Sequence, residues 1–158
     1  MKRLIAGAVV AGIAVFAGVS AFGDETVRDS TGAIVEGGGV GAFVVRTGDC
    51  LNTPEEGLVQ SVEGVPCLQP HDAEVYLKFD LAGTSYPGAA SVEETAIDGC
   101  LAGFHPFVGL AYEDSELDIL WLEPTEDSWN EQDDREIVCM VIAMDGSSLT
   151  GSVRGSGR

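Results

Sequence analysis

The longest hydrophobic segment of the chain comes first and runs from Leu4 to Phe22 without a charged residue. Two basic residues, Lys2 and Arg3, precede it, and acidic residues follow from Asp24. A helix over these 19 residues would be about 28 Å long, which matches the hydrocarbon core of a bilayer. The pattern therefore predicts a membrane helix over 4–22, with the N-terminus in the cytoplasm and the rest of the chain exported.

The end of this segment also offers an alternative to a retained anchor. Small residues in Val19-Ser20-Ala21 and Ala21-Phe22-Gly23 would suit a signal peptidase, so the chain could instead be secreted after cleavage near Ala21 or Gly23. Cleaved signals usually have a shorter apolar stretch of roughly 7–15 residues, and we therefore expect the anchor to be retained. Either way, the following domain is extracytoplasmic.

Beyond the apolar segment the chain becomes polar and rich in glycine. Residues 23–41, which contain Gly37-Gly38-Gly39, predict a flexible tether. Within it, the short apolar patch Ala33-Ile34-Val35 is able to add a strand or to dock on the domain that follows.

Strand patterns then dominate. Alternating or continuous apolar residues predict strands over 42–45, 59–67, 73–81, 117–122, 136–144 and 149–153. In the third of these, strict alternation places Val75, Leu77, Phe79 and Leu81 on one face. The strand over 136–144 is apolar throughout, which is typical of a central strand.

One long segment has helical spacing instead. Apolar residues recur every three or four positions over 92–104, after a capping box that begins at Ser91. The dipeptide His105-Pro106 should end this helix. Gly99 and Gly103 lower its propensity by about 1 kcal/mol each relative to alanine, so packing must compensate.

The order of these elements indicates a small α+β domain, mainly antiparallel β with one main helix. A second, short helical turn is expected after Thr125. We assign the domain to residues 42–153, preceded by the tether and followed by a disordered tail over 154–158, with residues 1–3 in the cytoplasm.

The composition excludes one class of partner. The chain has 26 acidic and 8 basic residues and a net charge of −18. Such a surface repels phosphate backbones, so we exclude nucleic acid and expect the charge to serve mainly solubility. Apolar residues still make up 45% of the chain, which is enough to form a core.

The four cysteines are candidates for disulfides, because an exported domain meets an oxidising environment. They have no C-x-x-C spacing and no histidine cluster beside them, so we expect no structural metal. Four cysteines allow three pairings. We favour Cys50–Cys67, which closes a compact loop, together with Cys100–Cys139, which would join the main helix to the apolar strand; reduced, buried cysteines are the alternative.

The sharpest candidate for a binding site is His71-Asp72, just before a predicted strand. A histidine beside carboxylates can hold a metal ion or transfer protons. Alternation, however, would place His71 and Ala73 on one face and Asp72 and Glu74 on the other, so His71 and Glu74 would not converge on one ion. We therefore take His71, Asp72 and Trp129 as candidate binding residues, and we predict no catalytic residue, no metal and no cofactor.

A series of short motifs gives the chain a resemblance to a known family. The motifs are Val45-Arg46-Thr47-Gly48-Asp49-Cys50, Val65-Pro66-Cys67, Pro70-His71-Asp72-Ala73-Glu74-Val75, Tyr86-Pro87-Gly88, Cys100, Pro124-Thr125-Glu126-Asp127-Ser128-Trp129, Asp133-Asp134-Arg135, Val138-Cys139 and Leu149-Thr150-Gly151-Ser152. In this order they resemble the actinobacterial septum formation domain, a cysteine-paired extracytoplasmic module often attached to one membrane helix. The resemblance covers about residues 42–153. It implies two disulfides and a link to cell division, and it implies no known reaction.

Two kinds of function fit this sequence. The first is a non-enzymatic module that is tethered to the membrane by residues 4–22 and binds envelope or division proteins. The alternative is an envelope hydrolase or ligand sensor that uses the His71-Asp72 region. We favour the first, because the chain has no G-x-S-x-G motif and its cysteines are expected to be paired.

Overall fold

The structure, a computed structural model, describes residues 8–11, 23–53 and 61–158. Its strands are β1 (Ala8–Ala11), β2 (Val27–Arg28), β3 (Ile34–Glu36), β4 (Gly38–Gly41), β5 (Cys50–Asn52), β6 (Ser61–Val65), β7 (Ala73–Asp80), β8 (Leu117–Pro124) and β9 (Glu136–Ala143). Its helices are α1 (Ala89–Val108), the 3-10 turn η1 (Tyr112–Asp114) and α2 (Glu126–Gln132).

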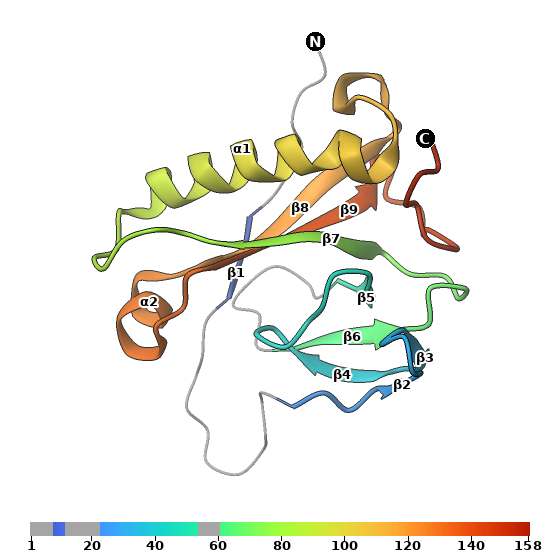
Figure 1. The fold of residues 1–158 in the computed structure, drawn as a ribbon, viewed down its shortest axis with the longest axis horizontal. Helices are drawn as coiled ribbons and strands as arrows, with labels where there is room; N and C mark the ends of the chain where they lie inside the picture. The colour runs from blue at the N-terminus through green and yellow to red at the C-terminus, as the bar shows by residue number, and fades with distance from the viewer. Residues whose placement is uncertain (1–7, 12–22, 54–60) are drawn as a thin grey trace.

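Seven strands form the main sheet in the order β1-β8-β9-β7-β5-β6-β4, and β2 pairs with β3 separately. Among the described residues the pairings are antiparallel, apart from β1 with β8. The expected α+β class is confirmed. Figure 1 shows α1 along one side of β7, β8 and β9, and β4 to β6 on the other side of β7.

The centre of the sheet follows the predicted strands. The patterns over 73–81, 117–122 and 136–144 correspond to β7, β8 and β9, and β9 is central because it pairs with both of the others. Residues of β9 alternate between two cores. Ile137, Cys139 and Val141 pack toward α1, whereas Val138 and Met140 pack on the opposite face.

The prediction that Val75 shares a face with the other apolar residues of β7 is wrong. Val75 lies opposite Met140 and Leu77 lies opposite Cys139, so Tyr76 is an extra residue in a β-bulge. The bulge breaks the alternation, and Val75 packs away from α1 while Tyr76 and Leu77 pack toward it. The Tyr76 hydroxyl uses this position to donate to the backbone carbonyl of α1 at residue 100, at 2.6 Å.

The predicted main helix is confirmed, but both of its ends differ from the prediction. It begins at Ala89 after Gly88, before the expected capping residue Ser91. It continues through Pro106 to Val108 and ends where Gly109, with φ 87°, donates to the carbonyl of residue 105. Pro106 is tolerated because it lies on the exposed side of the last turn, where the carbonyl that loses its donor can reach water.

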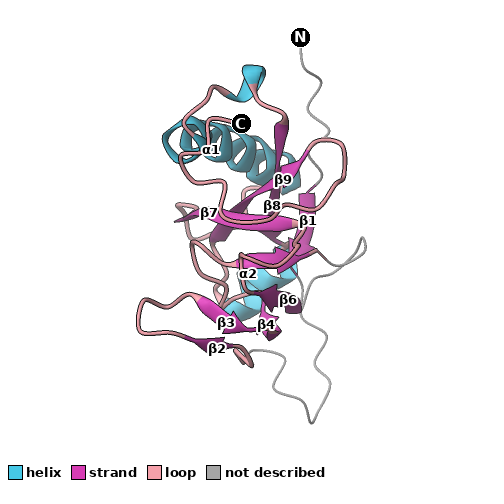
Figure 2. Cartoon of the chain, turned by 90° about the vertical axis from the view of Figure 1, so that its right-hand side faces the viewer, coloured by secondary structure: helices cyan, strands magenta, loops and turns pink. Residues whose placement is uncertain are grey.

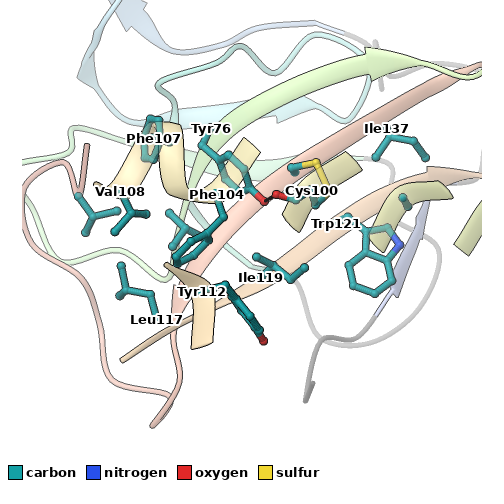
Figure 3. Packing of buried hydrophobic residues seen from close by; sticks show 14 of the residues in the cluster. Tyr76, Cys100, Phe104, Phe107, Val108, Tyr112, Leu117, Ile119, Trp121 and Ile137 are labelled. Atoms are coloured by element: carbon teal, nitrogen blue, oxygen red, sulfur yellow. Dashed lines mark hydrogen bonds between the residues drawn. A yellow bond between two sulfur atoms is a disulfide. The ribbon is translucent and has the colours of Figure 1, made fainter. Parts of the chain in front are cut away.

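The two glycines of α1 mark its closest approach to β7. A Cβ atom on Gly99 would lie 2.3 Å from the Phe79 ring, and one on Gly103 would lie 2.7 Å from Leu77. Glycine therefore permits a packing distance that any side chain would prevent. The Tyr76 and Phe104 rings meet edge to face in the same core, with centroids 6.3 Å apart (Figure 3).

Both expected disulfides are confirmed. Cys50 and Cys67 are joined with a Cα–Cα distance of 5.2 Å, and Cys100 and Cys139 with a distance of 5.5 Å. The second bond ties the middle of α1 to the central strand β9, and it lies within the core drawn in Figure 3.

In place of the predicted flexible tether, residues 23–41 form strands that belong to the domain. β4 pairs with β6, and a Cβ atom on Gly38 would come within 2.7 Å of the backbone carbonyl oxygen of Glu25. Glycine in this segment thus lets two stretches of backbone lie against each other. The apolar patch around Ile34 forms β3, as the alternative allowed, whereas the strand predicted over 42–45 is a turn.

The tail predicted to be disordered over 154–158 is instead held against the end of α1. The N–H groups of Gly155 and Gly157 donate to the carbonyls of Phe107 and Val108, at 2.7 and 2.9 Å. Both glycines have positive φ, which turns these N–H groups toward carbonyls that have no partner within the helix. The strand predicted over 149–153 is reduced to one bridge between Leu149 and His71, which lies two residues before β7.

The predicted membrane helix over 4–22 lies outside the described residues, apart from 8–11. Those residues form β1 instead, which adds a parallel strand to the edge of β8 with Ala8 opposite Trp121. No helix within the part of the chain that the structure describes is both long and apolar enough to span a bilayer.

Candidate functional site

His71 is buried, with 1% of its surface exposed. Its backbone N–H and C=O both pair with Leu149, at 3.0 and 2.7 Å, and its ring Nδ1 lies 2.8 Å from the carbonyl oxygen of Gln69. Since a carbonyl only accepts, Nδ1 is the donor in this contact. Nε2 is buried and has no hydrogen-bond partner among the described residues. The histidine is therefore part of the interior.

Glu74 is equally buried, with 1% of its surface exposed. Its carboxylate accepts from the Ser152 hydroxyl at 2.6 Å and from the Val153 N–H at 2.8 Å. Together with the pairing of His71 and Leu149, these contacts form a C-terminal clasp. Two motifs that carried the family resemblance, one at 70–75 and one at 149–152, thus hold each other in place.

Asp72 does not join Glu74 in the clasp, although alternation had placed the two on one face of the strand. It is half-buried and accepts from the N–H of Thr53 at 3.0 Å and from its hydroxyl at 3.3 Å. It lines a cavity of about 290 Å3 whose other walls include Leu120, Ile142 and Ser147. His71 and Asp72 therefore do not converge on one site.

Trp129 is 1% exposed and completes a packed corner beside α2. The predicted cap is confirmed, because the Thr125 side chain accepts from the N–H of residue 128 at 2.9 Å. The Arg135 guanidinium lies 3.7 Å from the indole centroid, and Tyr86 meets the indole edge to face. Burial raises the pKa of the neighbouring Asp134. The structure thus places the indole in the interior and not on an open face.

A charged cluster that sequence reasoning missed lies at the Arg46–Cys50 motif. Asp49 is 3% exposed, and its two oxygens accept from Arg28 Nη1 at 2.5 Å and Nη2 at 2.9 Å. Arg28 Nε also donates to Asp24 at 2.6 Å. The hydrogen bond to Asp49 raises the pKa of Arg28. Burial alone would raise the pKa of Asp24, but hydrogen bonds from Thr26 and Arg28 bring it below its ordinary value.

Sequence reasoning missed Arg28 because it lies among polar residues that were predicted to form a flexible tether. Its partner Asp49 is 21 positions away, a separation that no local pattern reveals. The one available signal was scarcity: only 8 basic residues occur in the whole chain, so each is notable.

Beside this cluster lies a larger cavity of about 530 Å3, the arginine cavity. It is lined by Thr31, Gly32, Ala33, Arg46, Thr47, Gly48, Asp49 and Arg154. These residues come from the turn between β2 and β3, the turn before β5, and the chain just after the clasp. Figure 2 shows β2 and β3 at the end of the molecule opposite α1.

The residues that line these two cavities suit binding. They include carboxylate, guanidinium and hydroxyl groups but no histidine and no cysteine. Within the described ranges, no group of three or more His, Cys, Asp or Glu residues is placed to hold a metal ion.

Comparison with known proteins gives one match. A family model described as septum formation matches residues 29–156. The match begins inside the segment that was expected to be a tether and ends within the segment that was expected to be a free tail. The structure likewise includes both segments in the folded domain. No curated protein and no solved structure matches the chain.

Proposed function

The chain belongs to the septum formation family, and from this premise we propose that it is a non-enzymatic, membrane-tethered interaction module of the cell envelope. The observation that carries the proposal is the match over residues 29–156, which takes in both disulfides, the C-terminal clasp and the arginine cavity. The family description suggests a role in septum formation. The attachment to the membrane and the binding of partners are proposals that go beyond this family description.

The two disulfides of the domain support an extracytoplasmic location. Disulfides persist in oxidising compartments and are rare in a reducing cytosol. The apolar segment over 4–22 would supply a route of export and an anchor, and in that state residues 8–11 would leave the edge of β8. The charge of −18 suits a soluble domain held near a membrane that it does not itself enter.

The burial of the titratable side chains in the family motifs supports a binding role over a catalytic one. His71, Glu74 and Asp49 would be the natural acid–base groups, and each is buried in contacts that hold the fold together. An enzyme that relied on them would need them to reach a substrate.

Crosslinking in living cells of the source organism tests the interaction role. A photoreactive residue at Leu68, which is apolar and 87% exposed, is compared with the same residue at Glu94, an exposed position on α1. We expect reproducible adducts with identified division or wall-synthesis proteins at position 68 only. No adduct at either position, or the same adducts at both, would count against the proposal.

The alternative, a hydrolase or ligand sensor, now has support only from Asp72, since it lines a cavity whereas His71 is buried. Asp72→Ala and His71→Ala separate the two readings. Loss of a ligand response in Asp72→Ala with an unchanged melting temperature would favour the sensor. Lower melting temperatures with unchanged function in both variants would make these residues structural.

A further inference from the structure

Two arginines differ from the other basic residues that the structure describes. Four of the six described bases lie 2.5 to 2.9 Å from a carboxylate: Arg28 with Asp49, Lys78 with Glu136, Arg135 with Asp133 and Arg158 with Glu116. Arg46 and Arg154 have no carboxylate this close among the described residues, and they line the same cavity.

Arg46 has only a long contact with an acid. Its guanidinium lies 3.6 Å from Asp24 Oδ2, and its side chain is 58% exposed. This separation is longer than a hydrogen bond, and the same oxygen already accepts from Arg28 Nε at 2.6 Å. The donors of Arg46 are therefore available to a ligand.

Arg154 is held by a ring instead of an acid. Its guanidinium carbon lies 4.6 Å from the centroid of Phe107. A contact over the ring face orients the guanidinium plane and leaves the N–H groups along its edge able to donate. No described carboxylate forms an ion pair with it.

The acids around the cavity are already engaged. Asp49 accepts from Arg28 through both oxygens and from the N–H of residue 46 at 2.8 Å. Asp29, at the turn between β2 and β3, accepts from Thr31 through its N–H and hydroxyl, at 2.8 and 2.6 Å. These carboxylates therefore compete only weakly for Arg46 and Arg154.

We propose that the arginine cavity binds a small ligand that carries one oxyanionic group, a carboxylate or a phosphate, with Arg46 and Arg154 as the donors. The inference rests on the proposed interaction role and specifies its ligand chemistry. Guanidinium groups match such oxyanions with two parallel hydrogen bonds. The cavity volume of about 530 Å3 falls within the usual range for small-molecule sites, roughly 300–1,000 Å3.

The charge of the whole chain limits the ligand. Its net charge of −18 repels an extended polyanion. Charges beyond a Debye length, about 8 Å at physiological salt, are largely screened, so the groups at the cavity itself decide the local attraction. A compact ligand with one or two negative charges therefore fits, and a nucleic acid or an anionic membrane surface does not.

Titration of the full-length, isotope-labelled protein in detergent tests this site. The probes are N-acetylalanine, its neutral amide as the matched control, and inorganic phosphate, all at constant ionic strength. We expect saturable amide chemical-shift changes at Thr47 and Gly48 with the carboxylate, the phosphate or both, and none with the amide. Saturation by one probe alone identifies the oxyanion.

Three variants complete the test. Arg46→Gln and Arg154→Gln should each weaken binding at least tenfold, whereas Arg158→Gln, an exposed arginine outside this cavity, should leave it unchanged. No saturation with either anion, or equal affinity in the doubly substituted protein, overturns the site. Septal localisation without anion binding would contradict the anion site but not the septal role. Anion binding without septal localisation would contradict the septal role but not the anion site.

Discussion

Glu74 shows how far apart in sequence the decisive contacts of this protein lie. Its carboxylate bonds with residues 78 and 79 positions later, Ser152 and Val153. Alternation places Glu74 on the same face of the strand as Asp72 and indicates no partner for it. Because alternation reports only neighbours along one strand, it cannot anticipate that the C-terminal segment covers that face.

At this scale the clasp makes a direct prediction. Glu74→Gln replaces one accepting oxygen with an amide nitrogen that faces a donor, so a buried polar group loses its partner. We expect the free energy of unfolding to fall by about 2–3 kcal/mol. Urea denaturation followed by circular dichroism measures the change.

Glu94→Gln is the matched control, since Glu94 is exposed on α1. Its effect should stay within about 0.5 kcal/mol. Equal stability of the two variants would show that the clasp contributes nothing.

Among the elements, those with strong periodicity could be predicted and those defined by distant contacts could not. β7, β8, β9 and the Thr125 cap of α2 follow from local pattern, because apolar spacing and capping chemistry act over a few residues. The bulge at Tyr76 could not be predicted from the sequence, because it depends on the register between β7 and β9. The strands within 23–41 were hidden by glycines that resemble a linker until β6 is beside them.

Helix α1 provides a test of close packing. Alanine at Gly99 should gain about 1 kcal/mol of helix propensity. Overpacking against Phe79 should cost about 1–3 kcal/mol, so Gly99→Ala should lower stability overall. Ala102→Gly, at an exposed position of the same helix, should lose about 1 kcal/mol through propensity alone. A Gly99→Ala protein more stable than the wild type in urea would contradict the close contact.

The two disulfides should differ in their response to reductant. Cys100 and Cys139 are 0% exposed, whereas Cys67 is partly exposed beside its buried partner Cys50. Under native conditions, mild reduction followed by alkylation and peptide mapping should label Cys50 and Cys67 first. Simultaneous labelling of both pairs would contradict this order.

Loss of the second disulfide should cost more stability than loss of the first. The pairs are separated by 17 and 39 positions. In the chain-entropy model they contribute about 3 and about 4 kcal/mol respectively.

For the whole molecule, the sequence predicted the family, the fold class and both disulfides, because each has a signature in spacing and order. It did not predict the arginine cavity, whose lining residues come from three distant segments brought together by folding. It also predicted a helix where the structure has β1. Residues 8–11 cannot lie in a membrane helix and pair with β8 at the same time.

We expect the anchor to be retained, which N-terminal sequencing of the protein isolated from membranes can test. The length of the apolar segment favours a mature chain that still begins at the original N-terminus. A mature chain that starts at Phe22 or Asp24 would establish cleavage instead.

Imaging tests the central claim, a role at the septum, most directly. The full chain is fused through a flexible linker to a fluorophore that folds after export, and dividing cells of the source organism are observed. The control carries residues 1–28 joined to an unrelated exported domain. We predict enrichment of the full chain at the septum and a uniform envelope signal for the control. The same uniform signal for both would contradict a septal role.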